Sequence, residues 1–396
     1  MSSRGRWLRS LTSVSANDRG VALDFTITDD QRELVAAVRD VLAKECPADL
    51  VRAVVEGRDS GEGLWRQQVA LGWPALVVPE EHGGLGLGTV ELILLVTELG
   101  RVAAPGPLVP TLTQFLAAIL EAGTPREQAR WLPAIAEGTV TGALAVAEDG
   151  RWDVPPRLVA TPQRDGFRLD GVKTHAVAGA DTDELVVSAS CADGIGLFVV
   201  PMRATVVTPV TSLDATRPLA TLAFDSVEVS ADRVLGVPGQ CRAALRRTLE
   251  VATLATAAET TGACQALSDM TVAYAKVREQ FGQPIGSFQA VKHALADVFV
   301  AIHKAQAVVQ FAAMTLAEDD PRRARAVAMA KSAAGDAQRL SAAAAIQLQG
   351  GVAYTWEHDA HLFVKRAKAG DALFGTAALH RQRLARLLAE ALPAPV

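Results

Sequence analysis

Residues 278–289 read REQFGQPIGSFQ and lie between two long stretches of helical periodicity. In the second stretch, apolar side chains recur every three or four positions from Val291 to Ile302, which predicts an amphipathic helix. The segment itself combines the cation Arg278 with amide side chains and two glycines, and such a turn can hold an anionic ligand. For an arbitrary sequence, a capped turn between helices with a solvated arginine is the plainer alternative.

Outward from this segment, the chain divides into two helical parts with a β part between them. Thr28 and Gln31 have the spacing of a capping box before an amphipathic stretch, and helical patterns separated by Gly- and Pro-rich breaks continue to residue 138. Short apolar runs and tight turns then predict strands, ending with the alternating run FDSVEV at 224–229. The helical period returns after Pro238 and continues almost to the C-terminus. We therefore expect an α+β protein with a flexible tail (1–22), an N-terminal helical domain (23–138), a middle β domain (139–238) and a C-terminal helical domain (239–396).

Composition excludes several classes of protein. A length of 396 residues favours two or three packed units, and 49% hydrophobic residues with 21% charged residues indicate a folded chain. The formal charge of -5 leaves no basic surplus for nucleic acid. The four cysteines are widely spaced, which predicts neither a disulfide framework nor a metal site and fits a reducing cytoplasm. No uninterrupted apolar run of about 18 residues suggests a membrane span.

Four segments of the chain resemble motifs of the acyl-CoA dehydrogenase family. Residues 278–289 are similar to its R-x-x-F-G-x-x-I-x-x-F-Q signature, and QLQGG at 347–351 is similar to its Q-x-x-G-G turn. FDSVEV at 224–229, followed by VLG at 234–236, resembles the end of its β domain, and EEHGGLG at 80–86 resembles an N-terminal loop. The resemblance runs in the same order from residue 24 to about residue 390.

The resemblance implies a fold and an activity. The fold would have an N-terminal helical domain, a β-barrel-like middle domain and a C-terminal four-helix bundle. The activity would be FAD-dependent conversion of an acyl-CoA thioester to its trans-2-enoyl form in a tetramer. A carboxylate would remove the α-proton, and flavin N5 would accept the β-hydride. An electron-transferring flavoprotein is the family's usual electron acceptor.

The same resemblance implies which residues bind the cofactor. In the family, the matching residues reach across a subunit interface to the pyrophosphate and adenine half of a neighbour's flavin. An arginine suits a pyrophosphate because its fork donates two charge-assisted hydrogen bonds, and glycines let backbone N–H groups approach closely. The predicted FAD-binding residues are Arg278, Phe281, Gln289, Gln347, Gly350 and Gly351.

The family's catalytic base is missing from both of its known positions. The commonest base is a Glu directly before Gly-Thr, and the aligned residue here is Phe374. The second position, counted back from Arg278, is Ala252. Glu250 should face away from that position, about 200° round a helix. Glu259 lies two turns along the same face as Ala252 and is either an unusual base or a structural Glu paired with a neighbour, so the catalytic residue stays unknown.

The β domain departs from the family pattern as well. Ala147 and His175 replace the Thr and Trp that would hold the isoalloxazine ring. A single His in such a strand is more often structural than catalytic. The positions that would contact the flavin ring and supply the base are thus substituted. The residues that would contact the flavin of a neighbouring subunit are retained.

A one-sided loss of this kind is what one subunit of a hetero-oligomer would show, and it resembles the actinobacterial α2β2 dehydrogenases of steroid side-chain CoA thioesters. We therefore expect a subunit that acts on a bulky acyl-CoA together with a homologous partner that supplies the base. Two alternatives remain: a self-sufficient homotetramer that uses Glu259 or another base, and a non-catalytic scaffold subunit.

Overall fold

The computed structural model describes residues 26–152, 155–177 and 182–390, so the predicted tail at 1–22 lies outside the described residues. The N-terminal part is helical, as expected. Its helix α2 starts at the predicted capping box. There the N–H of Thr28 donates to the side chain of Gln31 at 3.0 Å, and the N–H of Gln31 donates to the Thr28 hydroxyl at 3.2 Å. The helices of this part are α2 (Asp29–Glu45), α3 (Ala48–Val55), α4 (Glu62–Ala70), α5 (Thr89–Arg101), α6 (Leu108–Pro110), the π-helical turn η3 (Thr111–Leu116), α7 (Ala117–Ala122) and α8 (Pro125–Ala136).

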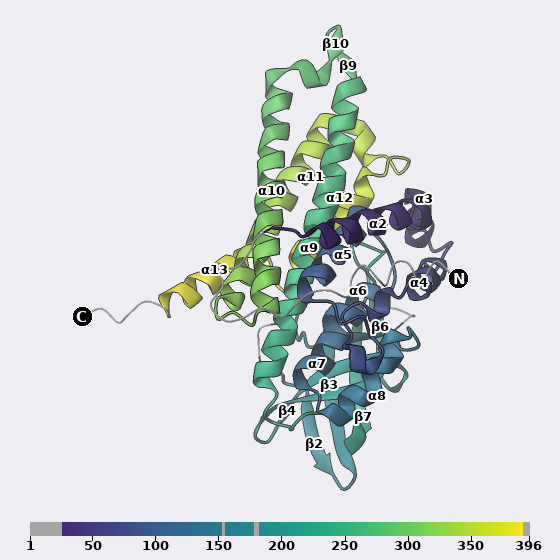
Figure 1. Ribbon diagram of the computed structural model, residues 1–396, viewed down its shortest axis with the longest axis vertical. Coiled ribbons are helices and arrows are strands. Elements are labelled where there is room, and N and C mark those ends of the chain that lie inside the picture. The colour runs from purple at the N-terminus through teal and green to yellow at the C-terminus, as the bar shows by residue number, and fades with distance from the viewer. Residues whose placement is uncertain (1–25, 153–154, 178–181, 391–396) are drawn as a thin grey trace, which may run out of the picture.

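The middle part is one twisted sheet at one end of the elongated molecule (Figure 1). Its strands run in the order β6-β7-β3-β2-β4-β5-β8, with β1 pairing in parallel to β4. Most other pairs are antiparallel, and the inward side chains of β3, β4, β5 and β7 form a separate apolar core. The strands are β1 (Gly142–Ala145), β2 (Val159–Gln163), β3 (Gly166–Ala176), β4 (Glu184–Cys191), β5 (Gly194–Pro201), β6 (Val206–Val210), β7 (Leu219–Ser230) and β8 (Val234–Leu235).

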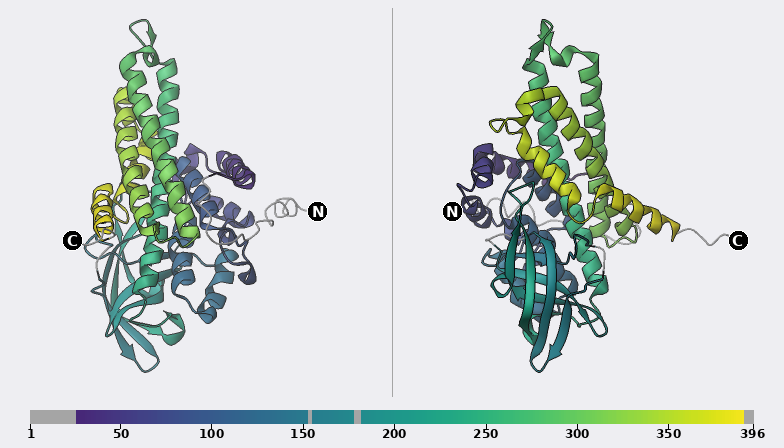
Figure 2. Two further views of the ribbon diagram at one scale, coloured as in Figure 1. Left: turned by 60° about the vertical axis from the view of Figure 1, so that its left-hand side comes forward. Right: turned by 180° about the vertical axis from the view of Figure 1, so that it is seen from behind.

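The C-terminal part is a bundle of long helices. α9 (Arg242–Val277) runs almost the length of the molecule beside α10 (Gln289–Ala317) and α11 (Arg323–Gln349) (Figure 1). The short strands β9 (Glu279–Gln280) and β10 (Gln283–Pro284) form a hairpin at the far tip. α12 (Ala360–Ala372) packs on α9 and α11, and α13 (Ala377–Ala389) points away from the body of the molecule (Figure 2). The predicted order of a helical, a β and a helical part is confirmed.

Helices α5 and α9 touch through their backbones. A Cβ atom at Gly100 would lie 2.2 Å from the carbonyl oxygen of Glu259, and one at Gly262 would lie 2.0 Å from that of Thr97. Larger side chains would push the helices apart, so both positions require glycine. The crossing fixes the N-terminal helices to the central part of α9.

By length and composition alone, α10 could cross a membrane: its mean hydropathy reaches 1.3 over 18 residues. That stretch contains some polar residues, which is why no uninterrupted apolar run marks it in the sequence. About 44% of it is buried in this chain, and core helices of globular proteins share these properties.

Candidate functional site

The signature turn and the Gly350-Gly351 turn line one cavity of about 660 Å³. Arg278 ends α9, with its N–H bonded to the carbonyl of Tyr274 at 2.9 Å. Gly350 ends α11 with φ +62°, a conformation that favours glycine. The structure therefore brings three of the six predicted residues, Arg278, Gly350 and Gly351, to one cavity although 72 residues separate Arg278 from Gly350 in sequence.

The other three predicted residues do not line this cavity. Phe281 is 93% exposed at the tip of the hairpin, where its ring meets Phe288 edge-on at 6.2 Å between centroids. Gln289 and Gln347 are exposed on α10 and α11. All three face outward from this chain, which is compatible with contacts to a second chain, but their role in binding stays a prediction.

Gln349 lines the cavity, and sequence reasoning missed it. Its side chain is buried and its amide donates to the Thr271 hydroxyl at 3.0 Å, which ties the end of α11 to α9. Residues two apart on a helix face nearly opposite sides. Gln347 and Gln349 therefore cannot both face α9, and the apolar spacing of α11 could have indicated which one does.

Both positions of the missing base meet in one apolar cluster. Phe374 and Ala252 are buried together with Val177 and Leu373. The indole of Trp152 packs against the cluster, with its ring centroid 5.9 Å from that of Phe374 and 6.1 Å from that of His175.

The loop that carries Phe374 is held by polar contacts from three side chains. His380 donates through Nε2 to the Phe374 carbonyl at 2.9 Å, and Asp371 accepts from the N–H of Ala377 at 3.0 Å. Lys331 donates to the carbonyls of Gly370 and Asp371 at the C-terminal end of α12, where a cation is favourable. Burial lowers the pKa of His380 to about 4 and the pKa of Lys331 to about 7.

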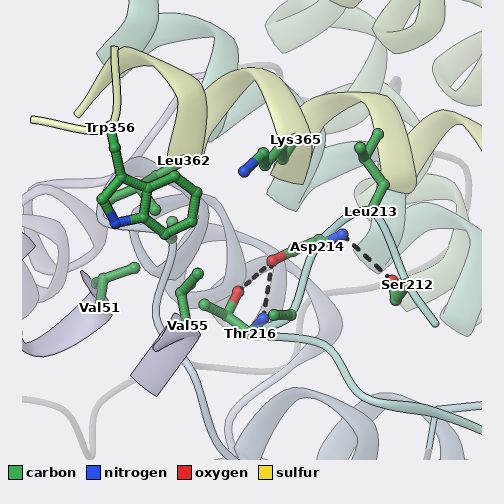
Figure 3. Close-up of a pocket in the computed structure, with 11 residues that line it drawn as sticks. Val51, Val55, Ser212, Leu213, Asp214, Thr216, Trp356, Leu362 and Lys365 are labelled. Atoms are coloured by element: carbon green, nitrogen blue, oxygen red, sulfur yellow. Dashed lines mark hydrogen bonds between the residues drawn. The ribbon is translucent and has the colours of Figure 1, made fainter. Parts of the chain in front are cut away.

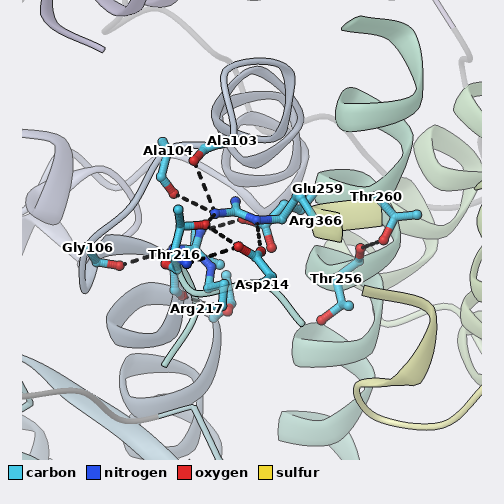
Figure 4. A network of polar contacts seen from close by, with 12 residues as sticks. Ala103, Ala104, Gly106, Asp214, Thr216, Arg217, Thr256, Glu259, Thr260 and Arg366 are labelled. Carbon is cyan, nitrogen blue, oxygen red and sulfur yellow. Dashed lines mark hydrogen bonds and ion pairs between the residues drawn. The ribbon is translucent and has the colours of Figure 1, made fainter. Parts of the chain in front are cut away.

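Glu259 belongs to a buried cluster of four charges (Figure 4). Its Oε1 accepts from Arg366 at 2.7 Å and from Arg217, and Arg366 also pairs with Asp214. The arginines further bond the carbonyls of Ala103, Ala104 and Gly106. Burial by itself raises the pKa of Asp214, but the charge of Arg366 and the hydroxyl of Thr216 bring it below its ordinary value. The cluster joins all three parts of the chain, and Glu259 is paired as the structural interpretation expects.

Glu250 is likewise paired rather than free. It is buried with its Oε2 2.9 Å from Nε of Arg323 on α11. Its side chain thus faces α11, and because residues two apart on a helix point to nearly opposite sides, Ala252 faces away from it.

Ala147 and His175 occupy the two β-domain positions where the family has the Thr and Trp that hold the isoalloxazine ring. Ala147 is buried, and its carbonyl accepts from Thr174 at 2.8 Å. His175 is half-buried with φ +53°, and its Nδ1 has no hydrogen-bond partner among the described residues. Next to Ala147, Glu148 forms a buried ion pair with Lys173 at 2.6 Å. Burial lowers the pKa of Lys173 to about 8 although Glu148 acts in the opposite direction.

Two family models match the chain over most of its length. The model of the acyl-CoA dehydrogenase N-terminal domain covers residues 28–139, and that of the C-terminal domain covers residues 241–389. The chain belongs to the acyl-CoA dehydrogenase family. Members of this family are FAD-dependent oxidoreductases, so the resemblance of the four motifs is confirmed.

Individual acyl-CoA dehydrogenases are similar along almost the whole chain. The acyl-CoA dehydrogenase IpdE2 of Mycobacterium tuberculosis is 35% identical over 94% of this chain and 100% of its own length. A chain of the ChsE4-ChsE5 complex of the same organism superposes with a TM-score of 0.86 at 28% identity, covering 94% of this chain and 100% of that one. A chain of the Tcur3481-Tcur3483 steroid ACAD superposes with a TM-score of 0.83 at 33% identity, covering 91% and 98%.

The residues of this acyl-CoA dehydrogenase fit the two halves of FAD unequally. The cavity with Arg278, Gly350 and Gly351 offers a guanidinium and a glycine turn, which suit a diphosphate. On the ring side, the described residues at the matching positions are the small Ala147 and the apolar Phe374, and the indole of Trp152 packs against Phe374. The described residues therefore suit the diphosphate of FAD better than its isoalloxazine ring.

Proposed function

We propose that this chain is one subunit of a heteromeric acyl-CoA dehydrogenase and that a homologous partner supplies the catalytic base and the seat of the flavin ring. Arg278 and the Gly350-Gly351 turn would bind the diphosphate half of the flavin held mainly by the partner. Two similar solved structures carry names that give two components, the ChsE4-ChsE5 complex and the Tcur3481-Tcur3483 steroid ACAD. This likeness supports the proposal.

One contrast supports the proposal: groups that suit a diphosphate are present at one place, and the residues at the two expected base positions are apolar. Arg278 lines one cavity together with the Gly350-Gly351 turn. At the other half, Phe374 and Ala252 replace both carboxylate positions inside an apolar cluster. A self-sufficient enzyme would need both halves.

The substrate that we propose is a bulky acyl-CoA thioester, such as a steroid side-chain CoA. Support comes from the steroid ACAD that is 33% identical to this chain. We also propose an electron-transferring flavoprotein as the acceptor and a cytoplasmic location, and the free thiols of all four cysteines are compatible with a reducing compartment.

The self-sufficient alternative with Glu259 as the base is disfavoured by the contacts of that carboxylate. A base must approach the α-carbon of the substrate to within hydrogen-bond reach. Glu259 instead pairs with Arg217 and Arg366 in a buried cluster, and releasing it would leave both guanidiniums with only the carboxylate of Asp214 to compensate them. The scaffold alternative differs from the proposal only in whether Arg278 contacts flavin.

Co-expression with a homologous acyl-CoA dehydrogenase subunit tests the proposal. The purified assembly should contain flavin and oxidise an acyl-CoA with an artificial electron acceptor, whereas neither chain alone should do so. Activity of this chain alone would support the self-sufficient alternative. An active partner whose flavin content and turnover do not change when this chain is added would support the scaffold.

A further inference from the structure

A second cavity, of about 210 Å³, lies where the three parts of the chain meet (Figure 3). It is lined from α3 by Val51 and Val55, from α12 by Leu362 and Lys365, and also by Ala103, Trp356 and the loop at 212–216. None of these residues lines the Arg278 cavity or belongs to the apolar cluster around Phe374. The two cavities therefore have no lining residue in common, although Thr355 of the Arg278 cavity directly precedes Trp356.

The indole of Trp356 is held in a fixed orientation at this cavity. Its Nε1 donates to Glu56 at 2.6 Å, across the boundary between the N-terminal and C-terminal parts. The His361 ring stacks on it at 4.6 Å between centroids with an interplanar angle of 19°. Arg52 bonds the carbonyl of Trp356 from α3. A half-exposed aromatic face with this many restraints is pre-organised to stack on a planar group.

Lys365 places an unpaired positive charge beside that face. Its Nζ lies 4.6 Å from the centre of the Trp356 ring (Figure 3), and among the described residues no carboxylate lies within 4.0 Å of it. Asp214, the acid that lines the cavity, is committed to Arg366 and Thr216. Arg52 is committed to Asp359. The cavity thus presents one uncompensated ammonium group, which matches a single negative charge better than a phosphate dianion.

The remaining walls fix the rest of the ligand. Val51, Val55 and Leu362 are apolar, and an apolar cavity of about 150 Å³ is enough to hold benzene. A cavity of about 210 Å³ therefore has room for one such ring and a carboxylate group. The Ser212 hydroxyl accepts from the N–H of Asp214 at 3.2 Å and keeps its own proton for donation to an anion.

We propose that this cavity is a binding site for a small planar monocarboxylate of about the size of benzoate. The carboxylate pairs with Lys365 and accepts from Ser212, while the ring stacks on Trp356 and packs against Val55 and Leu362.

Titration of the purified full-length chain with sodium benzoate, followed by calorimetry and by ligand-observed NMR, tests the site. We expect saturable binding below about 10 mM and at least about tenfold weaker binding of benzyl alcohol, which has the ring without the charge. Lys365→Met keeps the length of the stem and should weaken benzoate by about tenfold or more. Lys368→Met is the matched control, because Lys368 is exposed on the same helix and does not line the cavity.

Val55→Phe provides a second test that leaves the charges unchanged. The larger side chain should fill the cavity and abolish benzoate binding, and circular dichroism checks that each variant is folded. Absence of saturable benzoate binding by the wild-type chain, equal affinity of Lys365→Met, or equal affinity for benzyl alcohol would each overturn the proposal. These outcomes leave the flavin proposal untouched, since none of them involves the Arg278 cavity.

Discussion

The indole of Trp152 packs against the phenyl ring of Phe374, with the ring centroids 5.9 Å apart and the planes inclined at 49°. By the motif resemblance, Phe374 stands at the position of the family's commonest catalytic Glu, and Trp152 comes from the β-domain segment that would face the flavin ring. The loss of the base and the loss of the ring contacts therefore meet in one apolar contact. Arg278 and the Gly350-Gly351 turn line a separate cavity with groups that suit a diphosphate.

Arg278→Ala should lower flavin occupancy of the assembled heteromer without dissociating it. A charge-assisted bond to a phosphate contributes roughly 1.5–3 kcal/mol, or about ten- to a hundredfold in affinity. Arg278→Lys should restore only part of this affinity, since a point charge lacks the bidentate fork. Flavin absorbance at limiting flavin concentration measures the effect, and Arg246→Ala, an exposed arginine on the same helix, is the control. Full occupancy in both Arg278 variants would rule out the shared site.

Glu259→Gln should destabilise the fold without removing a catalytic base. The substitution leaves Arg217 and Arg366 facing only Asp214 in a buried cluster. The free energy of unfolding, measured in urea, should therefore fall by about 3–5 kcal/mol. Turnover per flavin of the folded assembly should stay within a few fold. A positioned general base contributes about 10²–10⁴-fold, so a loss of that size with unchanged flavin content would identify Glu259 as the base.

Stability should fall as the pH drops below about 6.5, partly because of His380. Burial holds the pKa of this imidazole at about 4 in the folded chain. Between pH 6.5 and 4 the unfolded chain therefore binds a proton that the folded chain does not, and the difference amounts to about 3 kcal/mol over the whole interval.

His380→Gln isolates this contribution. Glutamine can still donate to the Phe374 carbonyl but does not titrate. The unfolding free energy of the variant should therefore depend less steeply on pH in this window than that of the wild-type chain. Urea unfolding of both proteins from pH 7.5 to 4.5 gives the comparison. Parallel curves would show that His380 is not the group responsible.

Lys365→Met should raise the pKa of His361. Burial lowers the pKa of this imidazole below its ordinary value, and the charge of Lys365 lowers it further, with Arg52 acting in the same direction and Asp359 against them. Removing the ammonium group of Lys365 removes its charge effect but not the effect of burial. The titration midpoint of His361 should therefore move to higher pH and remain below that of an exposed histidine. NMR titration of the His361 ring protons measures the shift, and an unchanged midpoint would place Lys365 away from the Trp356–His361 stack.

The fold could be predicted from the sequence because its signals are local. The capping box at Thr28 and Gln31, the change from helical to strand periodicity, and the motif at 278–289 each occupy a short stretch. The convergence of Arg278 with Gly350 was accessible only through the family resemblance, since these residues come from different helices.

The parts of the site that depend on distant contacts could not be predicted. Glu259 meets Arg366 from 107 residues away, and no spacing rule links them. The same holds for the contact of Trp152 with Phe374 across two domains. The motif resemblance points to Gln347, whose role stays a prediction, whereas the burial of Gln349 against Thr271 depends on which face of α11 meets α9.

The absorbance near 450 nm of this chain purified alone tests most directly whether a partner subunit holds the flavin ring. Because Ala147 and His175 replace the residues expected to hold the ring, and because Trp152 and Phe374 pack together beside them, the protein should be colourless or poor in flavin. Flavin should appear when the chain is purified with a homologous subunit. A yellow homotetramer with one flavin per chain would contradict the account.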